Sequence, residues 1–144
     1  MDEADLLFQL DGDADVMKYI TLGIPRTMDE VIEKSMTRIL KSYQDKTDFG
    51  IFAAYLINSE KYIGWFQFEE DKEFEHSIEI GWRLKKQYWG NGYATEVATV
   101  LCDLGIKMGK TIVARAMIEN LASIRVMEKA GLKFEKKFWY PDSS

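Results

Sequence analysis

Hydrophobic and polar residues follow two different periods along this chain, and each period predicts one kind of element. From Thr27 to Tyr43, apolar residues recur every three or four positions, which predicts an amphipathic helix. Thr27 is its expected N-cap, because Glu30 stands three residues further on in a capping-box pattern. Further along, alternating segments separated by short polar turns predict an antiparallel meander of three strands, at 50–57, 62–69 and 74–84.

The rest of the chain predicts further helices and strands around this meander. Residues 2–20 read as one or two short helical pieces, broken near Asp11-Gly12-Asp13. Behind the meander, Gly109 and Gly131 end two helical patterns, and Asn120 is the expected N-cap of the second helix. The predicted elements are a helix at 93–108, a strand at 111–118, a helix at 121–130 and a last strand at 133–140.

This order of elements predicts a mixed α/β fold. The strand at 74–84, the helix at 93–108 and the strand at 111–118 form a crossover unit, so the two strands should lie parallel with a right-handed connection. The other neighbouring strands should be antiparallel. We therefore expect a central mixed sheet of mostly antiparallel strands with one splayed parallel pair, flanked by about four helices. Residues 1–144 are long enough for one domain with its own core.

A glycine-rich loop joins the third strand to the helix at 93–108. It reads Gln87-x-x-Gly90-x-Gly92. Glycines let backbone N–H groups approach a ligand, and the following helix N-terminus carries partial positive charge, so the loop predicts a phosphate or pyrophosphate cradle. The dinucleotide fingerprint requires G-x-G-x-x-G, and the P-loop requires a Gly-Lys-Ser/Thr ending. Neither pattern is present.

Composition and charge narrow the function classes. The formal net charge of −5 argues against nucleic acid as a partner and suits a cationic substrate, although acidic surfaces also serve solubility. Cys102 is the single cysteine and lies in an apolar helical pattern, so we expect a packing role and a reducing, cytoplasmic location. No apolar run has transmembrane length, so no membrane partner is expected. With His76 as the single histidine, a histidine-based metal site is not expected.

The glycine loop resembles the acetyl-CoA-binding motif of the GNAT acetyltransferase superfamily. Residues 88–96 are similar to the "W-G-x-G-x-A-x-E" version of the RimJ/RimL-like branch, which acetylates ribosomal-protein N-termini and many other amines. Residues 119–134 resemble the "N-x-x-S…K-x-G-F" segment of that branch, and residues 15–20 resemble its N-terminal helix. The matches span about residues 13 to 135.

Three features depart from the family pattern. Family members usually begin with a strand before the helices and end with a further strand, so both outer strands are expected to be missing or shortened here. An exposed sheet edge favours pairing with another chain, which predicts a homodimer. Asn91 stands where many relatives carry Lys or Arg. The cradle would then depend on backbone N–H groups, with Lys85, Lys86 or Lys129 supplying nearby positive charge.

The resemblance implies transfer of an acetyl group from acetyl-CoA to a primary amine that attacks the thioester directly. Such a reaction needs a held acyl-CoA, a deprotonated amine, donors for the developing oxyanion and a proton for the thiolate. A protein N-terminus, a polyamine, another small amine or an antibiotic amino group are all open as acceptors. The alternative is a non-catalytic CoA-binding module, or one that a partner chain completes.

The resemblance also implies roles for individual residues. The loop backbone would hold the pyrophosphate, and the pantetheine arm would lie along the third strand. Ser123 would contact the cofactor and also donate a proton to the departing thiolate. Asn120 would contact the pantetheine arm, or it could serve as a helix cap alone. The expected cofactor-binding residues are Trp82, Leu84, Gln87, Tyr88, Trp89, Gly90, Asn91, Gly92, Tyr93, Ala94, Asn120 and Ser123.

Glu79 is the expected general base. Alternation along the third strand places Glu79, Gly81 and Arg83 on one face, opposite the apolar residues. A carboxylate in a partly apolar cleft can take a proton from the amine, directly or through water. The alternatives are a Glu79–Arg83 ion pair on that face, or a solvated charge.

Overall fold

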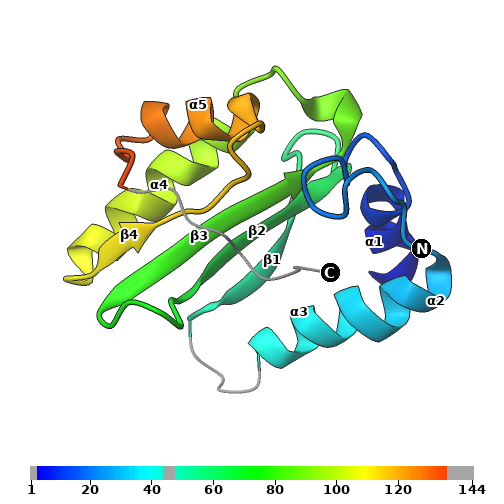
Figure 1. Cartoon of the computed structure of the whole chain (residues 1–144), viewed down its shortest axis with the longest axis horizontal. Helices are drawn as coiled ribbons and strands as arrows, with labels where there is room; N and C mark the ends of the chain where they lie inside the picture. Colours follow the sequence, from blue (N-terminus) through cyan, green and yellow to red (C-terminus); the bar gives the residue numbers. More distant parts are fainter. Residues whose placement is uncertain (1–2, 44–47, 136–144) are drawn as a thin grey trace.

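A computed structural model describes residues 3–43 and 48–135 of the chain. A twisted sheet crosses the middle of the molecule, with helices on both faces (Figure 1). Four strands are hydrogen-bonded in the order β1-β2-β3-β4. The sheet consists of β1 (Gly50–Tyr55), β2 (Tyr62–Glu70), β3 (Ser77–Leu84) and β4 (Thr111–Val113).

The pairing confirms the predicted mixed sheet. β1 pairs with β2 and β2 pairs with β3, both antiparallel, as the meander pattern predicted. β3 and β4 are parallel, as the crossover predicted. β1 therefore lies at one edge of the four described strands and β4 at the other.

The helices confirm most of the predicted positions. The first helix ends at Asp11, where the break was expected. Two short turns of other helix types also occur, a π-helical segment η1 and a 3₁₀ turn η2. The helical elements are α1 (Glu3–Asp11), α2 (Met28–Glu30), η1 (Val31–Met36), α3 (Thr37–Ser42), η2 (Lys86–Tyr88), α4 (Tyr93–Lys107) and α5 (Leu121–Lys129).

The run from α2 through α3 shows how far local pattern determines a helix. Thr27 caps it as predicted: its hydroxyl accepts the Glu30 N–H at 3.2 Å, and the Glu30 carboxylate accepts the Thr27 N–H at 3.0 Å. The π-helical middle was not predicted. Because the helix covers only part of the sheet, its buried residues are Val31 and Ser35, whereas Ile32 is half exposed. The periodicity predicted the helix correctly, but fewer of its apolar residues are buried than the pattern indicated.

Three predicted strands are too long at one end, and the first of them ends at Tyr55 rather than Ile57. The third strand begins at Ser77 rather than Phe74, because the Asp71 side chain accepts the Glu73 and Phe74 N–H groups at 3.1 and 2.8 Å and closes a turn. The strand expected to reach Ile118 ends at Val113, where the chain leaves β3.

The predicted last strand, at 133–140, is absent from the part of it that the structure describes. Residues 133–135 have no strand, and residues 136–140 lie outside the described residues.

The two faces of the sheet differ in chemistry. Toward α4 and α5, Phe68, Ile78 and Ile80 pack against Ala98 and Cys102 in one buried cluster. Burial of each such large side chain stabilises the fold by about 1.5–3 kcal/mol, and the buried Cys102 confirms the expected packing role. The face toward α1 carries Glu79, Gly81 and Arg83 in alternation, as predicted, beside Gln67 and Glu69 of β2.

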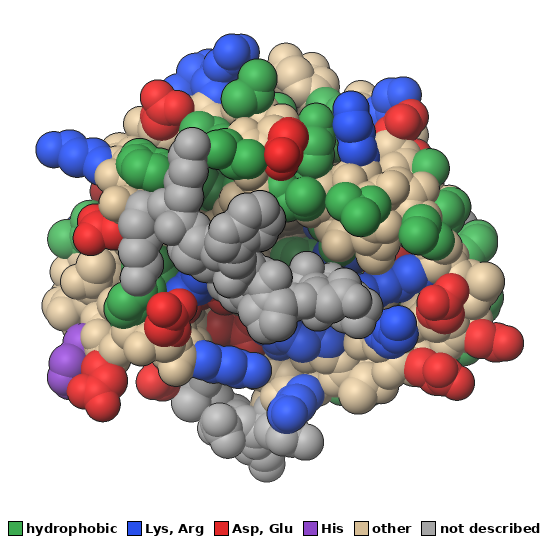
Figure 2. Space-filling model, viewed as in Figure 1, with side chains coloured by type: hydrophobic (Ala, Val, Ile, Leu, Met, Phe, Trp, Pro, Cys, Tyr) green, Lys and Arg blue, Asp and Glu red, His purple; other side chains and the backbone are tan. Residues whose placement is uncertain are grey.

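Surface charge is mixed in the orientation of Figure 1. Lys, Arg, Asp and Glu side chains alternate around the rim, and hydrophobic side chains gather over the α4–α5 part (Figure 2). Several large apolar side chains there are exposed, among them Val100, Leu104 and Leu121. In the part of the chain that the structure describes, no helix is long and apolar enough to cross a membrane.

Candidate active site

The parallel strand pair separates after three residues, and this separation forms the site. Pairing of β3 with β4 runs from Ser77↔Thr111 to Glu79↔Val113 and then ends. β3 continues to Leu84, while the chain after β4 turns toward α5. One edge of β3 beyond Glu79 is thus not paired with β4. An extended ligand could add its polar groups to the backbone there.

A cavity of about 130 Å³ occupies the gap between the separating strands. Ile80, Gly81 and Trp82 of β3 form one wall. Residues from both sides of the sheet close it: Ile20 belongs to the cluster under α1, whereas α5 packs on the opposite face through Val126. The other lining residues are Tyr19, Ile20, Arg115, Ala116, Met117, Asn120, Ser123 and Met127. The gap therefore places groups from both faces around one small space.

The glycine loop lies at the carboxyl end of β3 and leads directly into α4. Gly90 and Gly92 have φ angles of 76° and 81°, a backbone conformation that side chains with a Cβ rarely adopt. A Cβ at either position would meet no heavy atom within 4 Å, so the space over the loop is open. The first N–H groups of α4 have no partner within the helix. Open space, flexible backbone and a helix N-terminus together fit a diphosphate group.

Side chains of this loop brace it from within. The Asn91 amide donates to the backbone carbonyls of Tyr88 and Trp89, both at 3.2 Å. The Trp89 indole N–H donates to the Leu84 carbonyl at 2.9 Å, and the Tyr88 and Tyr93 rings lie 6.4 Å apart. These side chains fix the loop shape, which leaves ligand contact to the backbone.

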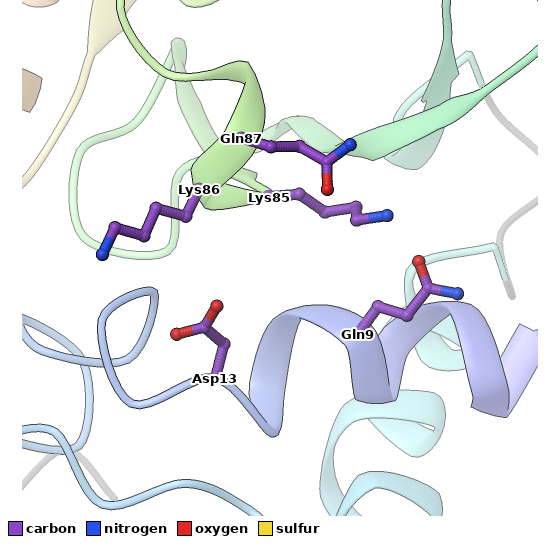
Figure 3. A pocket seen from close by; sticks show the side chains of 5 residues that line it. All are labelled: Gln9, Asp13, Lys85, Lys86 and Gln87. Atoms are coloured by element: carbon purple, nitrogen blue, oxygen red, sulfur yellow. The ribbon is translucent and has the colours of Figure 1, made fainter.

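A second, larger hollow of about 630 Å³ lies beside the loop on its α1 side (Figure 3). Lys85, Lys86 and Gln87 face Gln9 and Asp13 across it. None of these five residues lines the cavity between the strands. Three of the residues expected to bind the cofactor, Trp82, Asn120 and Ser123, line the smaller cavity.

The lysines near the loop have local partners. The Lys86 ammonium lies 2.6 Å from Asp15, and this contact raises the pKa of Lys86 and lowers that of Asp15. The Lys85 ammonium lies 5.9 Å from the centre of the Tyr88 ring. The positive charge expected from Lys86 is therefore already compensated by a carboxylate.

Asn120 and Ser123 come together at the start of α5. The Asn120 carbonyl oxygen accepts the Ser123 N–H at 3.2 Å, which confirms the predicted N-cap. Both residues also line the cavity, opposite Trp82 of β3. Leu84, by contrast, is buried with Ile63 and Phe66, so only its backbone is available for a ligand.

Glu79 lies beside the cavity and is separated from it by an arginine. Its carboxylate accepts a hydrogen bond from Arg115 Nη1 at 2.9 Å and another from Gln67 Nε2 at 3.0 Å. Arg115 itself lines the cavity. The alternative Glu79–Arg83 pair is wrong, because Arg83 turns to the buried Asp11 at 2.7 Å.

Sequence reasoning missed Arg115 and its partner Asp71. Arg115 forms a fork with Asp71, at 2.6 and 3.1 Å, and the hydrogen bond from the guanidinium is the main cause that lowers the pKa of Asp71. A single charged residue in the apolar run from 111 to 118 was the available signal. A strand pattern alone gave no reason to read it as part of a site.

Among residues 3–43 and 48–135, no three or more His, Cys, Asp or Glu side chains are grouped to hold a metal ion.

Comparison with known proteins gives the family. The model of the acetyltransferase (GNAT) domain matches residues 1–133. The uncharacterized N-acetyltransferase YnaD of Bacillus subtilis is 32% identical over 135 residues, which cover 92% of this chain and 74% of that protein.

Solved structures give the same result. A GNAT-family acetyltransferase from Bacillus anthracis has a TM-score of 0.74 and 31% identity, over 93% of this chain and 76% of that one. The aminoglycoside acetyltransferase AAC(6')-Ib, in complex with coenzyme A and kanamycin, has a TM-score of 0.74 at 21% identity, over 99% and 87% of the two chains. The chain therefore belongs to the GNAT family and is an acyl-CoA-dependent N-acetyltransferase.

Proposed function

We propose that this enzyme transfers the acetyl group of acetyl-CoA to a primary amine that attacks the thioester directly. The observation that carries the proposal is the cavity between β3 and the segment after β4. Trp82, Asn120 and Ser123 meet there, beside the second half of β3, and the open glycine loop follows the carboxyl end of the same strand. A single extended ligand along β3 could therefore reach both places.

Binding falls mainly to the backbone in this proposal. The N–H groups from Gln87 to Ala94 would hold the diphosphate, since Gly90 and Gly92 leave the space above them open. The pantetheine arm would follow the edge of β3 near Trp82 and Leu84, where β4 no longer pairs. Bound acetyl-CoA would supply the thioester at the cavity.

Proton transfer would involve two side chains. Glu79 would take the proton that the amine loses, either directly or through a water molecule at the cavity edge. Ser123 lines the cavity, and its hydroxyl would donate a hydrogen bond to the departing thiolate. Asn120 would contact the arm in addition to capping α5.

The amine acceptor is proposed as a class of compounds and not as one compound. We propose a RimJ/RimL-like enzyme acting on a protein N-terminus, a polyamine or another small amine. The formal net charge of −5 suits a cationic acceptor. AAC(6')-Ib, which shares the fold, was solved with the aminoglycoside kanamycin. The homodimer, the cytoplasmic location and the absence of nucleic-acid and membrane partners stay predictions.

One observation favours the alternative of a non-catalytic CoA-binding module. Both oxygens of Glu79 accept hydrogen bonds, one from Arg115 and one from Gln67, so the base is engaged before any amine arrives. Under this alternative, acetyl-CoA would bind without turnover against protein N-terminal peptides, polyamines or aminoglycosides. A steady-state assay with that amine panel separates the two functions.

Titration calorimetry with acetyl-CoA tests the binding half of the proposal. Gly92→Trp is expected to abolish binding, because the side chain would fill the space over the loop. Gly109→Trp is the matched control, since Gly109 has a similar φ of 77° and equally open surroundings at the far end of α4. The control should bind as the wild type does. Unchanged affinity in a folded Gly92→Trp variant would contradict the loop assignment.

A further inference from the structure

We infer that Arg115 is a positioning residue for acetyl transfer, which holds the Glu79 carboxylate in place at the edge of the cavity. The inference rests on the proposed function, in which Glu79 is the base. Arg115 would not touch the reacting atoms as a proton donor or acceptor. It would act through Glu79.

The guanidinium of Arg115 is itself fixed by Asp71. Two parallel contacts, Nη1 to Oδ1 at 2.6 Å and Nη2 to Oδ2 at 3.1 Å, form a bidentate fork. The Asp71 side chain is only 2% exposed and accepts the Glu73 and Phe74 N–H groups, so it cannot move freely. A planar guanidinium held by such a fork has a defined orientation, which a lysine ammonium would not have.

From this fixed position, Arg115 reaches the expected base. Nη1 donates to Glu79 Oε2 at 2.9 Å, while Gln67 donates to Glu79 Oε1 from the other side. The carboxylate is thus held at both oxygens. Arg115 also lines the cavity, so this residue links the proposed base to the proposed place of reaction.

Charges around Glu79 indicate what loss of Arg115 would do. Glu69 of β2 is its cross-strand neighbour and pairs with Arg38 of α3. Asp71 and Glu73 of the β2–β3 turn both contact Arg115. Without the guanidinium, the Glu79 carboxylate would stand near other carboxylates and lose its contacting cation. Protonation would then be favoured, and a protonated Glu79 cannot act as a base.

The pH profile of kcat/KM tests this inference with two variants that should act in opposite directions. In Arg115→Met, the acid limb is expected to move to higher pH by about one unit or more. In Asp71→Asn, one carboxylate is lost and the cation stays, so the acid limb should stay in place or move to lower pH. If Arg115 only supported the local fold, both variants would change the profile alike. Equal shifts, or no shift in Arg115→Met, would overturn the inference.

Arg115→Lys keeps the charge without the fork and covers the case in which the methionine variant does not fold. It is expected to keep the acid limb in place and to lower kcat about ten- to a hundredfold, because the base is no longer held in position. A wild-type kcat in Arg115→Lys would overturn the positioning role. A wild-type enzyme that binds acetyl-CoA and acetylates no amine would overturn both the inference and the proposed function, whereas an active enzyme with an unshifted Arg115→Met profile would overturn the inference alone.

Discussion

Two ion-pair clusters lie on the α1 side of the sheet, and they differ in burial. In the first, the fully buried Asp11 contacts Arg83 of β3 at 2.7 Å and Arg26 at 3.5 Å, and accepts a hydrogen bond from Ser35. In the second, exposure of the carboxylate side chains around Arg115 rises from 2% at Asp71 through 27% at Glu79 to 54% at Glu73. Only the second cluster borders the cavity.

This difference separates a structural role from a chemical one. The Asp11 cluster joins α1, the α2–η1 helix and β3, and one carboxylate serves two guanidinium groups there. Burial lowers the pKa of Arg83, whose side chain also lies over the Trp65 ring at 5.0 Å. The Arg115 cluster has more carboxylates than cations and is partly open to the cavity. A partly exposed carboxylate can exchange protons with a substrate, whereas a closed network cannot.

The largest predicted effect is on the stability of the buried cluster. Asp11→Ala leaves two largely buried guanidinium groups without their carboxylate, so the free energy of unfolding should fall by about 3–5 kcal/mol. Urea unfolding followed by circular dichroism measures the loss. Asp15→Ala is the control, because it breaks the exposed pair with Lys86 and should leave the unfolding midpoint unchanged. Equal midpoints for the two variants would remove the distinction between the clusters.

The next predicted effect is on rate. Glu79→Gln keeps the size of the side chain and removes the base, so kcat/KM should fall about 10²- to 10⁴-fold. The unfolding midpoint and the affinity for acetyl-CoA should stay close to those of the wild type. Glu70→Gln, at the exposed end of β2, is the matched control and should keep full activity. A Glu79→Gln enzyme with the wild-type rate at every pH would show that Glu79 is not the base.

The smallest predicted effect is a pH dependence of stability. Arg115 lowers the pKa of Asp71 in the folded state, so this carboxylate stabilises the fold above the ordinary aspartate pKa of about 3.9 and the contribution is lost as pH falls through the folded value. Asp71→Asn should therefore cost about 1 kcal/mol at pH 7. The difference in free energy of unfolding between variant and wild type should shrink as the pH falls below about 4. A constant difference from pH 7 to pH 3 would contradict this origin.

The sequence predicted what depends on neighbours along the chain. The caps at Thr27 and Asn120, the meander, the crossover and the glycine loop all follow from local pattern, and the structure confirms them. The separation of β4 from β3 agrees with the expected splayed parallel pair, but its position was not predicted, because the apolar pattern continued beyond Val113. Periodicity reports which residues could form a strand and does not report where a partner strand ends.

Ion pairs show the same limit more sharply. The alternative reading paired Glu79 with Arg83, four residues along one strand face. In the structure, Arg83 contacts Asp11, which is 72 residues away in the sequence, and Glu79 contacts Arg115, which is 36 residues away. Sequence separation of this size hides a partner from any local rule. The sequence therefore allowed Glu79 to be proposed as a base, and it did not allow the partners of Glu79 to be predicted.

Gly81 limits which residues homologues can carry around this site. It lines the cavity and lies opposite Gln67, whose amide oxygen would be 2.5 Å from a Cβ at position 81. A larger residue there would narrow the gap and also displace Gln67, which donates to Glu79. Positions 67 and 81 should therefore covary among homologues: where 81 acquires a side chain, 67 should change with it.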